Sequence, residues 1–339
     1  MERYVWELTH ALAALDHPVI VLCEKAYETY SESITVYELG EIFQKPRWLS
    51  MLCFSSKVSH WLRRFDHQSW VIHSHERTGV HDVTTFHGPP FVQRKTRFLD
   101  ILSPRIHAWT FLEKRELCGR HVKVVLPNSN LIEDLLHAYY PCCRSTLASP
   151  AYPAVNELFK KITRSKPGKT IGFIGKEWER KGLDVACKVV EALRKRDKNI
   201  SLLVVGPQAR DVKHLFTHWP EGSYELAGWV RTEDALSRID VLLHPARFEP
   251  FGMVIAEANA AGIPCVISAP CGIAPLLTTD MGKVLPLEAE VDLWASALLP
   301  YLEKERPSVR PMGLFWPALA ARHAVVYSAV LSEKGLSTL

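Results

Sequence analysis

Short apolar runs alternate with longer amphipathic stretches along most of this chain. In the second half, residues 170–175, 201–206 and 265–268 are rich in Val, Ile and Leu, typical of strands buried on both faces of a parallel sheet. Residues 183–193 and 233–237 have the spacing of helices. This alternation predicts an α/β domain in which helices cover a parallel sheet.

The first half shows the same alternation of apolar runs and amphipathic stretches, but less regularly. Its apolar runs predict strands at residues 19–22, 69–73, 82–86 and 122–126. A buried helix is expected over residues 2–15. A second helix follows the last strand, with Asn128 or Ser129 as its N-cap. Residues 314–331 are expected to form the last helix.

The chain is long enough for two domains, each with its own core, because it has 339 residues. Residues 141–168 are rich in Pro, Ser and Lys and lack periodicity. We therefore expect one domain over residues 1–150, a linker over 151–168, a second domain over 169–312, and a terminal helix within 313–339.

Charge is distributed unevenly, although the whole chain carries a net charge of only +4. Residues 1–43 have two basic and eight acidic groups, whereas residues 44–125 have fourteen basic and six acidic groups. The basic region suits a phosphorylated acceptor or an anionic membrane surface. The alternative is a solvated face with dispersed charge. We expect no nucleic-acid partner.

The eight cysteines form no C-x-x-C pair and no metal-ligand spacing. With no signal peptide visible, they favour a reduced, cytoplasmic compartment. No apolar run approaches the length of a membrane span, so any membrane contact would be peripheral, on the inner face of the cytoplasmic membrane. Residues 46–65 mix aromatic and basic side chains and are either such an interfacial helix or a helix packed on the sheet.

Residues 247–262 are the most informative segment, because they place Glu249 and Glu257 eight positions apart, where a strand's end leads into a helix. Ligands of open α/β sheets bind at that edge, where helix N-termini favour anions. A carboxylate and a diphosphate repel each other, so these two glutamates would instead accept hydrogen bonds from neutral hydroxyl groups of the ligand. A nucleotide-sugar has hydroxyls on its ribose and on its hexose. The alternative is two surface glutamates favoured by the helix dipole.

This arrangement resembles the E-x7-E signature of the retaining glycosyltransferases of family 4. The resemblance implies the GT-B fold, with two Rossmann-like doubly wound domains that face a cleft. It also implies that the helix within residues 313–339 crosses back to the N-terminal domain. Within the family, residues 175–182, 240–272 and 282–286 resemble the lipopolysaccharide core glucosyltransferases.

The resemblance assigns roles to individual residues. Glu249 would bind the donor sugar, Glu257 the ribose, and Arg180 and Lys181 the diphosphate as it leaves. His87, at the end of a first-half strand, would lie beside the donor sugar. Further donor-binding positions are Gly175, Lys176, Val230, Arg231, Phe251, Gly252, Gly272 and Ile273.

The implied reaction transfers a hexose, with a UDP-sugar favoured as donor, to a saccharide or lipid-linked acceptor. Synthesis of lipopolysaccharide or another cell-envelope glycan is the expected context. We expect neither a cofactor nor a metal: His73, His75 and His81 complete no ligand set, and the chain has no D-x-D pair. The rival interpretations are a non-catalytic nucleotide-sugar-binding protein and a sugar-nucleotide epimerase of the same fold.

The chain departs from the family at its first residues, because Met1 falls inside the helix that follows the family's first strand. That strand is central in the N-terminal sheet, and burying about three of its side chains would contribute ~5–9 kcal/mol. We therefore expect the true start to lie roughly 10–15 residues upstream, because a strand and a short loop together have about that length.

Overall fold

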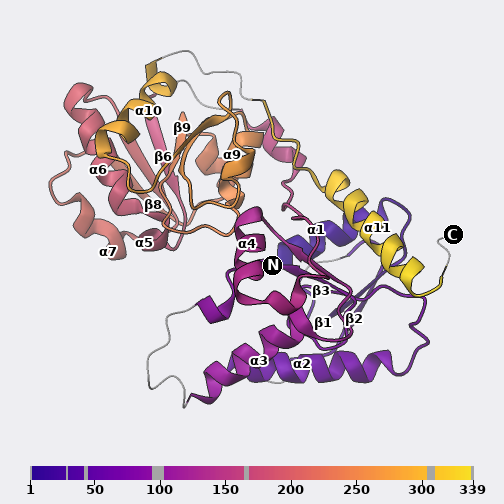
Figure 1. The fold of residues 1–339 in the computed structure, drawn as a ribbon. Coiled ribbons are helices and arrows are strands. Elements are labelled where there is room, and N and C mark those ends of the chain that lie inside the picture. The colour runs from indigo at the N-terminus through magenta and orange to yellow at the C-terminus, as the bar shows by residue number, and fades with distance from the viewer. Residues whose placement is uncertain are drawn as a thin grey trace. The chain divides into compact units, whose positions relative to one another are not determined.

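The computed structural model describes residues 2–27, 30–41, 45–93, 103–163, 168–303 and 310–336. The chain divides into two compact units: unit 1 comprises Met1–Pro153 and Trp316–Leu339, and unit 2 comprises Ala154–Phe315 (Figure 1). Both are α/β units with parallel strands, which confirms the predicted fold class. Residues 151–168, predicted as a linker, are shared between the two units, and 164–167 lie outside the described residues.

Unit 2 is built on a six-stranded parallel sheet with the order β11-β10-β9-β6-β7-β8. Its strands are β6 (Thr170–Ile174), β7 (Ser201–Val205), β8 (Tyr224–Gly228), β9 (Val241–His244), β10 (Cys265–Ser268) and β11 (Gly282–Leu285). Its helices are η4 (Glu157–Lys161), α5 (Trp178–Lys181), α6 (Leu183–Arg196), α7 (Ala209–Val212), η5 (Lys213–Phe216), α8 (Thr232–Leu236), α9 (Met253–Ala260), η6 (Ala274–Leu276) and α10 (Val291–Glu303).

The main core of unit 2 lies between one face of this sheet and the helices α6 and α10. Alternate strand residues such as Phe173, Val204 and Leu243 point into it, because successive side chains of a strand face opposite sides. Trp294 of α10 is fully buried there. Helix α9 lies on the other face, as Figure 1 shows, so both faces of the sheet are covered.

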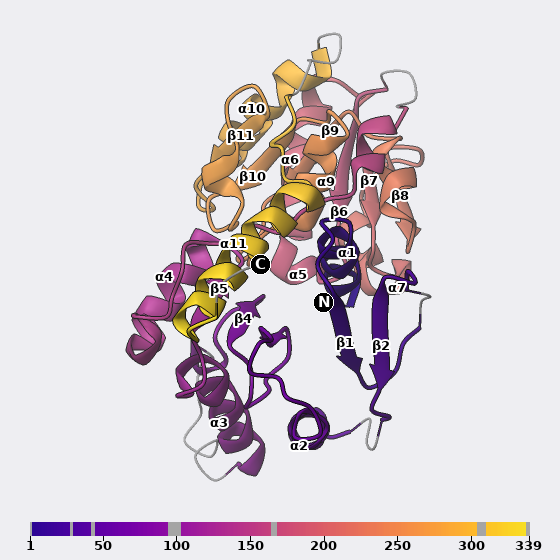
Figure 2. The ribbon, with the colours of Figure 1, turned by 90° about the vertical axis from the view of Figure 1, so that its right-hand side faces the viewer.

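Unit 1 contains two separate parallel sheets instead of one (Figure 2). The strands β1 (Val19–Cys23) and β2 (Ile34–Glu38) pair only with each other, whereas β3 (His73–Ser74), β4 (Val83–Phe86) and β5 (Val124–Pro127) form the order β3-β4-β5. In the described part of unit 1, β1 and β3 thus each have an unpaired edge. The start expected upstream of Met1 stays a prediction.

The helices of unit 1 include the first and the last helix of the described residues. They are α1 (Glu2–Ala13), α2 (Arg47–Leu62), η1 (Phe91–Gln93), α3 (Pro104–Cys118), α4 (Asn130–Tyr139), η3 (Pro141–Cys143) and α11 (Trp316–Glu333). Helix α11 packs beside α1 (Figure 1). The rings of Tyr4 and Trp316 meet there edge to face at 5.2 Å. Ser129 caps α4 by accepting a hydrogen bond from Ile132 N.

Helix α2 packs against the strands, the second of the two interpretations of residues 46–65. Val58, Trp61 and Leu62 are buried in a cluster with side chains such as Trp70 and Ile72. Trp61, one of the two tryptophans of this helix, therefore contributes to the core of unit 1. Across the described ranges, no helix combines the length and hydropathy needed to cross a membrane.

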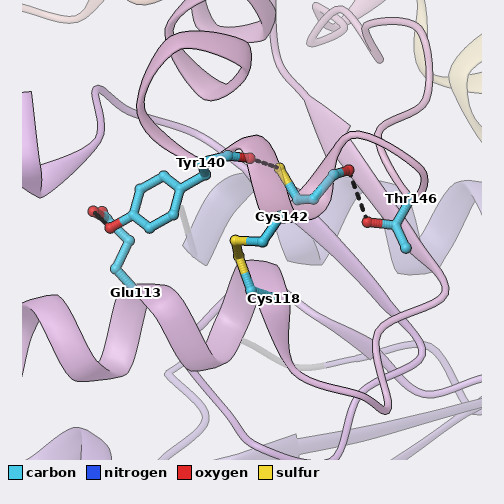
Figure 3. The surroundings of a disulfide bond; sticks show 6 residues. Glu113, Cys118, Tyr140, Cys142 and Thr146 are labelled. Carbon is cyan, nitrogen blue, oxygen red and sulfur yellow. Dashed lines mark hydrogen bonds between the residues drawn. A yellow bond between two sulfur atoms is a disulfide. The ribbon is translucent and has the colours of Figure 1, made fainter.

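A disulfide joins Cys118, at the end of α3, to the exposed Cys142 of η3 (Figure 3). Tyr140, the residue before η3, also contacts α3, because its hydroxyl donates to Glu113 Oε2 at 2.7 Å. The sequence analysis did not predict this bond: it treated the cysteines as reduced thiols. The other six cysteines are free, and four of them are buried.

Candidate functional site

The loops after β6 and β9 meet at the one point in the unit 2 sheet where the strand order reverses. From β6 the chain proceeds through β7 to β8 on one side, and from β9 through β10 to β11 on the other. In open α/β sheets the carboxyl ends of the strands at such a reversal form the ligand-binding crevice. The two strongest motifs of the sequence, residues 175–182 and 247–262, both lie here.

Backbone hydrogen bonds fix Glu249 against the loop that follows β10. Glu249 N donates to Pro270 O at 2.9 Å, and Gly272 N donates to Glu249 O at 2.9 Å. Ile273 N donates in the same way to Phe251 O. The predicted turn at Gly272 and Ile273 is therefore positioned directly beside the first glutamate.

Three nitrogen groups surround a single oxygen of the Glu249 carboxylate. Oε2 lies 3.3 Å from Lys181 Nζ, 3.4 Å from Arg180 Nη1 and 3.4 Å from His244 Nε2. Within the described residues, no hydrogen bond or ion pair reaches the other oxygen, Oε1. One oxygen is held by the protein, and the other remains available to a ligand.

This environment keeps Glu249 ionised. Burial alone would raise its pKa, but the contacts with His244, Lys181 and Arg180 outweigh burial and lower the pKa to about 2. Burial lowers the pKa of His244, so that this imidazole is neutral near pH 7. The site thus combines one carboxylate, two cations and a neutral imidazole.

Arg180 is held by more than this ion pair. Its guanidinium also pairs with Glu177 and donates to Phe248 O, and its backbone oxygen accepts from Arg247 N at 2.8 Å. Arg247 in turn makes a bidentate pair with Asp184 at 2.9 and 2.7 Å. These contacts connect α5 to the loop after β9.

Two glycines of the site are required by geometry. A Cβ on Gly175 would lie 2.1 Å from Lys181 Cδ, so the absence of a side chain leaves room for the lysine to reach Glu249. Gly252 has φ +112° at the start of α9, and a Cβ there would lie 2.8 Å from Ile255 Cδ1. Both were predicted as donor-binding positions.

The remaining predicted donor residues are placed around the same sheet edge. Glu257 is half-buried on α9, Phe251 and Ile273 are buried, and Lys176 is exposed. Val230 and Arg231 follow β8, and Arg231 Nε lies 3.7 Å from Glu233. Trp229, between them and the strand, is 82% exposed. The ligand contacts assigned to these residues stay predictions.

His87 lies in unit 1, directly after β4, within a group of aromatic side chains. Its Nε2 is 3.2 Å from His75 Nδ1, and the ring of Tyr4 meets it edge to face at 4.7 Å. Asn128 Nδ2 donates to its carbonyl at 2.9 Å. Burial lowers the pKa of His87 to about 3, so the ring is neutral near pH 7. Its role beside a donor sugar stays a prediction.

The neighbouring histidines have structural partners. His73 is hydrogen-bonded to Tyr327 Oη at 2.6 Å and Thr85 Oγ1 at 2.8 Å, and His81 to Thr78 Oγ1 at 2.8 Å. Over the ranges that the structure describes, no group of three or more His, Cys, Asp or Glu residues is arranged to hold a metal ion.

Sequence reasoning missed His244 as a site residue. It is the last residue of the apolar strand β9 and stands immediately before Pro245. The signal was present: a histidine at the carboxyl end of a buried parallel strand stands where ligand-binding side chains of this fold emerge.

Two protein-family models match the chain, and both describe glycosyltransferases. The model "Glycosyltransferase Family 4" matches residues 1–148, and "Glycosyl transferases group 1" matches residues 168–304. The unmatched residues are the connection between the units and the C-terminal end. The resemblance stated from the motifs is therefore confirmed.

Curated relatives match at moderate identity. An uncharacterized 42.6 kDa protein in the cps region of Klebsiella pneumoniae is 27% identical over 56% of this chain and 48% of its own length. A GDP-mannose-dependent alpha-mannosyltransferase of Mycolicibacterium smegmatis is 26% identical over 78% of this chain and 71% of its own length. The chain thus spans only about half the length of the first of these relatives.

The fold matches solved structures over nearly the whole chain. WaaG, a glycosyltransferase involved in lipopolysaccharide biosynthesis, aligns with a TM-score of 0.71 and covers 98% of this chain and 94% of its own, at 18% identity. An identity this low shows the fold alone, which is the GT-B arrangement of two Rossmann-like units.

Proposed function

We propose, since the chain belongs to glycosyltransferase family 4, that it is a retaining transferase that moves a hexose from a nucleotide-diphosphate sugar to a saccharide or lipid-linked acceptor. A UDP-sugar is the favoured donor. Synthesis of lipopolysaccharide or another cell-envelope glycan is the proposed context, and contact with the membrane would be peripheral.

The observation that carries this proposal is the environment of Glu249. A carboxylate whose Oε2 is held by three nitrogen groups and whose Oε1 is open can accept hydrogen bonds from sugar hydroxyls. Two cations, Arg180 and Lys181, lie on the same site and can bind a diphosphate. A nucleotide-sugar offers both groups in one molecule.

The proposed reaction breaks the bond between the anomeric carbon and the diphosphate oxygen. The acceptor hydroxyl attacks that carbon from the leaving-group face, forms the new glycosidic bond and passes its proton to the departing phosphate. Arg180, Lys181 and the backbone turn at Gly272 stabilise the charge that grows on the diphosphate. Interactions that strengthen in the transition state raise the rate.

In this proposal Glu249 orients the hexose and Glu257 accepts hydrogen bonds from the ribose diol. No covalent protein intermediate is invoked. No metal ion is invoked either, because two fixed cations supply the positive charge that the leaving group needs.

A second candidate, a non-catalytic nucleotide-sugar-binding protein, is favoured by the divided sheet of unit 1. In that case the donor site of unit 2 would function without transfer. Sequential incubation with donor alone and with donor plus acceptor separates the two.

The decisive experiment for the proposed activity is a release assay with UDP-glucose, GDP-mannose and ADP-glucose, with lipopolysaccharide-core and phospholipid extracts as acceptors. Acceptor-stimulated release of one nucleoside diphosphate, abolished in Glu249→Gln, supports the transferase. Binding of a donor without any release, in wild-type protein and with every acceptor, would leave only the binding protein.

A further inference from the structure

His244 stands at a position in the sheet where its orientation is fixed. It is the last residue of β9, which lies between β6 and β10, and its backbone is in register with Ile267 of β10. Its neighbour Leu243 points into the core formed with α6 and α10, so His244 faces the opposite side of the sheet. The side chain is completely buried.

At a buried position that needs only packing, a histidine is less favourable than an apolar side chain. Neither ring nitrogen of His244 makes a hydrogen bond within the described residues. Leaving a buried donor or acceptor unsatisfied destabilises the folded protein, whereas an apolar side chain of similar size has no polar group to leave unsatisfied. The polar group that Nε2 approaches is Glu249, at 3.4 Å.

The three groups around Glu249 Oε2 would respond differently to a bound donor. Arg180 and Lys181 are cations, and an incoming diphosphate attracts them away from the carboxylate. His244 is neutral and buried, so it gains little from the diphosphate and stays beside Oε2. The carboxylate would lose its two charged partners at the moment when it must hold the sugar.

We propose that His244 is the positioning residue that keeps Glu249 oriented once Arg180 and Lys181 engage the donor diphosphate. Nε2–H donates to Oε2, because an ionised carboxylate can only accept. The 3.4 Å separation closes to a hydrogen bond in the donor complex, as contacts of this kind often do when a ligand arrives. Oε1 is then directed at the hexose hydroxyls. This role rests on the proposed donor site.

The test compares two variants with the same functional group in different places. His244→Gln carries an amide nitrogen close to the position of Nε2, whereas His244→Asn carries it near Nδ1. Gln is close to histidine in size, whereas Asn is one methylene shorter and leaves the larger void. Thermal unfolding of each variant measures its own packing effect and separates that effect from the effect on the ligand.

Affinity is measured for UDP, GDP and ADP and for UDP-glucose, GDP-mannose and ADP-glucose, together with kcat for the donor that turns over. In the proposed site the nucleoside diphosphate makes no contact with Glu249, whereas the sugar of the intact donor does. In His244→Asn we expect unchanged affinity for the diphosphate, roughly tenfold weaker binding of the nucleotide-sugar, and a kcat ten- to a hundredfold lower. His244→Gln should stay within a few fold of wild type.

Equal losses in the Gln and Asn variants, or equal losses for diphosphate and nucleotide-sugar, would overturn the positioning role and leave His244 as a packing residue. A wild-type protein that binds none of the six ligands would instead remove the proposed donor site, and this role with it. The two failures are thereby distinguished by the wild-type titration alone.

Discussion

Lys181 Nζ lies 3.3 Å from Glu249 Oε2, so a residue predicted to bind the donor diphosphate is paired with one predicted to bind the donor sugar. Lys181 comes from the end of α5 and Glu249 from the loop after β9, 68 positions later in the chain. In the unliganded site each neutralises the other. A donor that carries both a diphosphate and hydroxyls can replace this pair with its own contacts.

Removing the charge of Glu249 should therefore have opposite effects on two ligands. In Glu249→Gln, Arg180 and Lys181 lose their carboxylate partner and remain free for phosphate oxygens. We expect affinity for the nucleoside diphosphate to rise a few fold while transfer falls about ten- to a hundredfold, the loss expected for a hydrogen bond to a charged group. Isothermal titration calorimetry measures the affinity for the nucleoside diphosphate, and a transfer assay measures the rate of transfer. Parallel weakening of both would contradict the pairing.

Adding a methyl group at Gly175 should displace Lys181 without unfolding unit 2. The new Cβ would lie 2.1 Å from Lys181 Cδ, and a flexible side chain can move aside. We expect Gly175→Ala to weaken diphosphate binding about tenfold, the loss of one charge-assisted contact. Lys181→Ala should lose as much, and the double variant no more than either. Additive losses of affinity in the double variant would show that Gly175→Ala weakens diphosphate binding independently of Lys181.

Acid should destabilise unit 1 through its buried histidines. Burial lowers the pKa of His81 to about 4, and that of His323 to about 4 as well, against about 6.5 in an unfolded chain. Between these values the unfolded chain binds more protons, so the free energy of unfolding falls as pH drops from 6.5 to 4. His81 alone accounts for about 3 kcal/mol of this loss by pH 4.

Urea unfolding at pH 7.5, 6.5, 5.5 and 4.5 measures how steeply the free energy of unfolding changes with pH. The matched variant is His81→Gln, which cannot titrate: it should be less stable than wild type at pH 7.5 and lose less stability on acidification. An identical pH slope in both proteins would show that His81 contributes nothing to it.

Removing the disulfide should lower stability without touching the donor site of unit 2. Cys118 and Cys142 are 24 positions apart, and closing a loop of that size contributes about 3–4 kcal/mol in the chain-entropy account. We expect the free energy of unfolding, measured by urea titration, to be lower by this amount in Cys118→Ser/Cys142→Ser. A dithiol reductant should lower it equally in wild type and leave the variant unchanged. Equal stability with and without reductant would exclude the bond in solution.

The hydrophobic pattern predicted β6, β7 and β10 of unit 2 well, because each is a short, mostly buried run of apolar residues. It predicted the region before β4 poorly. Strand β2 at Ile34–Glu38 was missed because only Ile34 is buried, and β3 is two residues long where a strand over 69–73 was expected. Edge strands with exposed residues lack the alternation on which such predictions depend.

The candidate site was predictable where a motif marks it, as at Glu249 and Lys181. His244 and the Cys118–Cys142 pair were not, because each depends on tertiary contact. His244 becomes a site residue only when the loop after β9 folds back to place Glu249 beside it. Cys142 meets Cys118 only through the packing of η3 on α3.

Thermal unfolding with UDP-, GDP- and ADP-sugars determines whether the edge of unit 2 that carries Lys181 and Glu249 is a nucleotide-sugar site. We expect one donor to raise the unfolding temperature by several degrees, because a ligand at a hundred times its Kd contributes about 2.7 kcal/mol. The shift should vanish in Glu257→Ala. No shift with any donor in the wild-type protein would contradict the account.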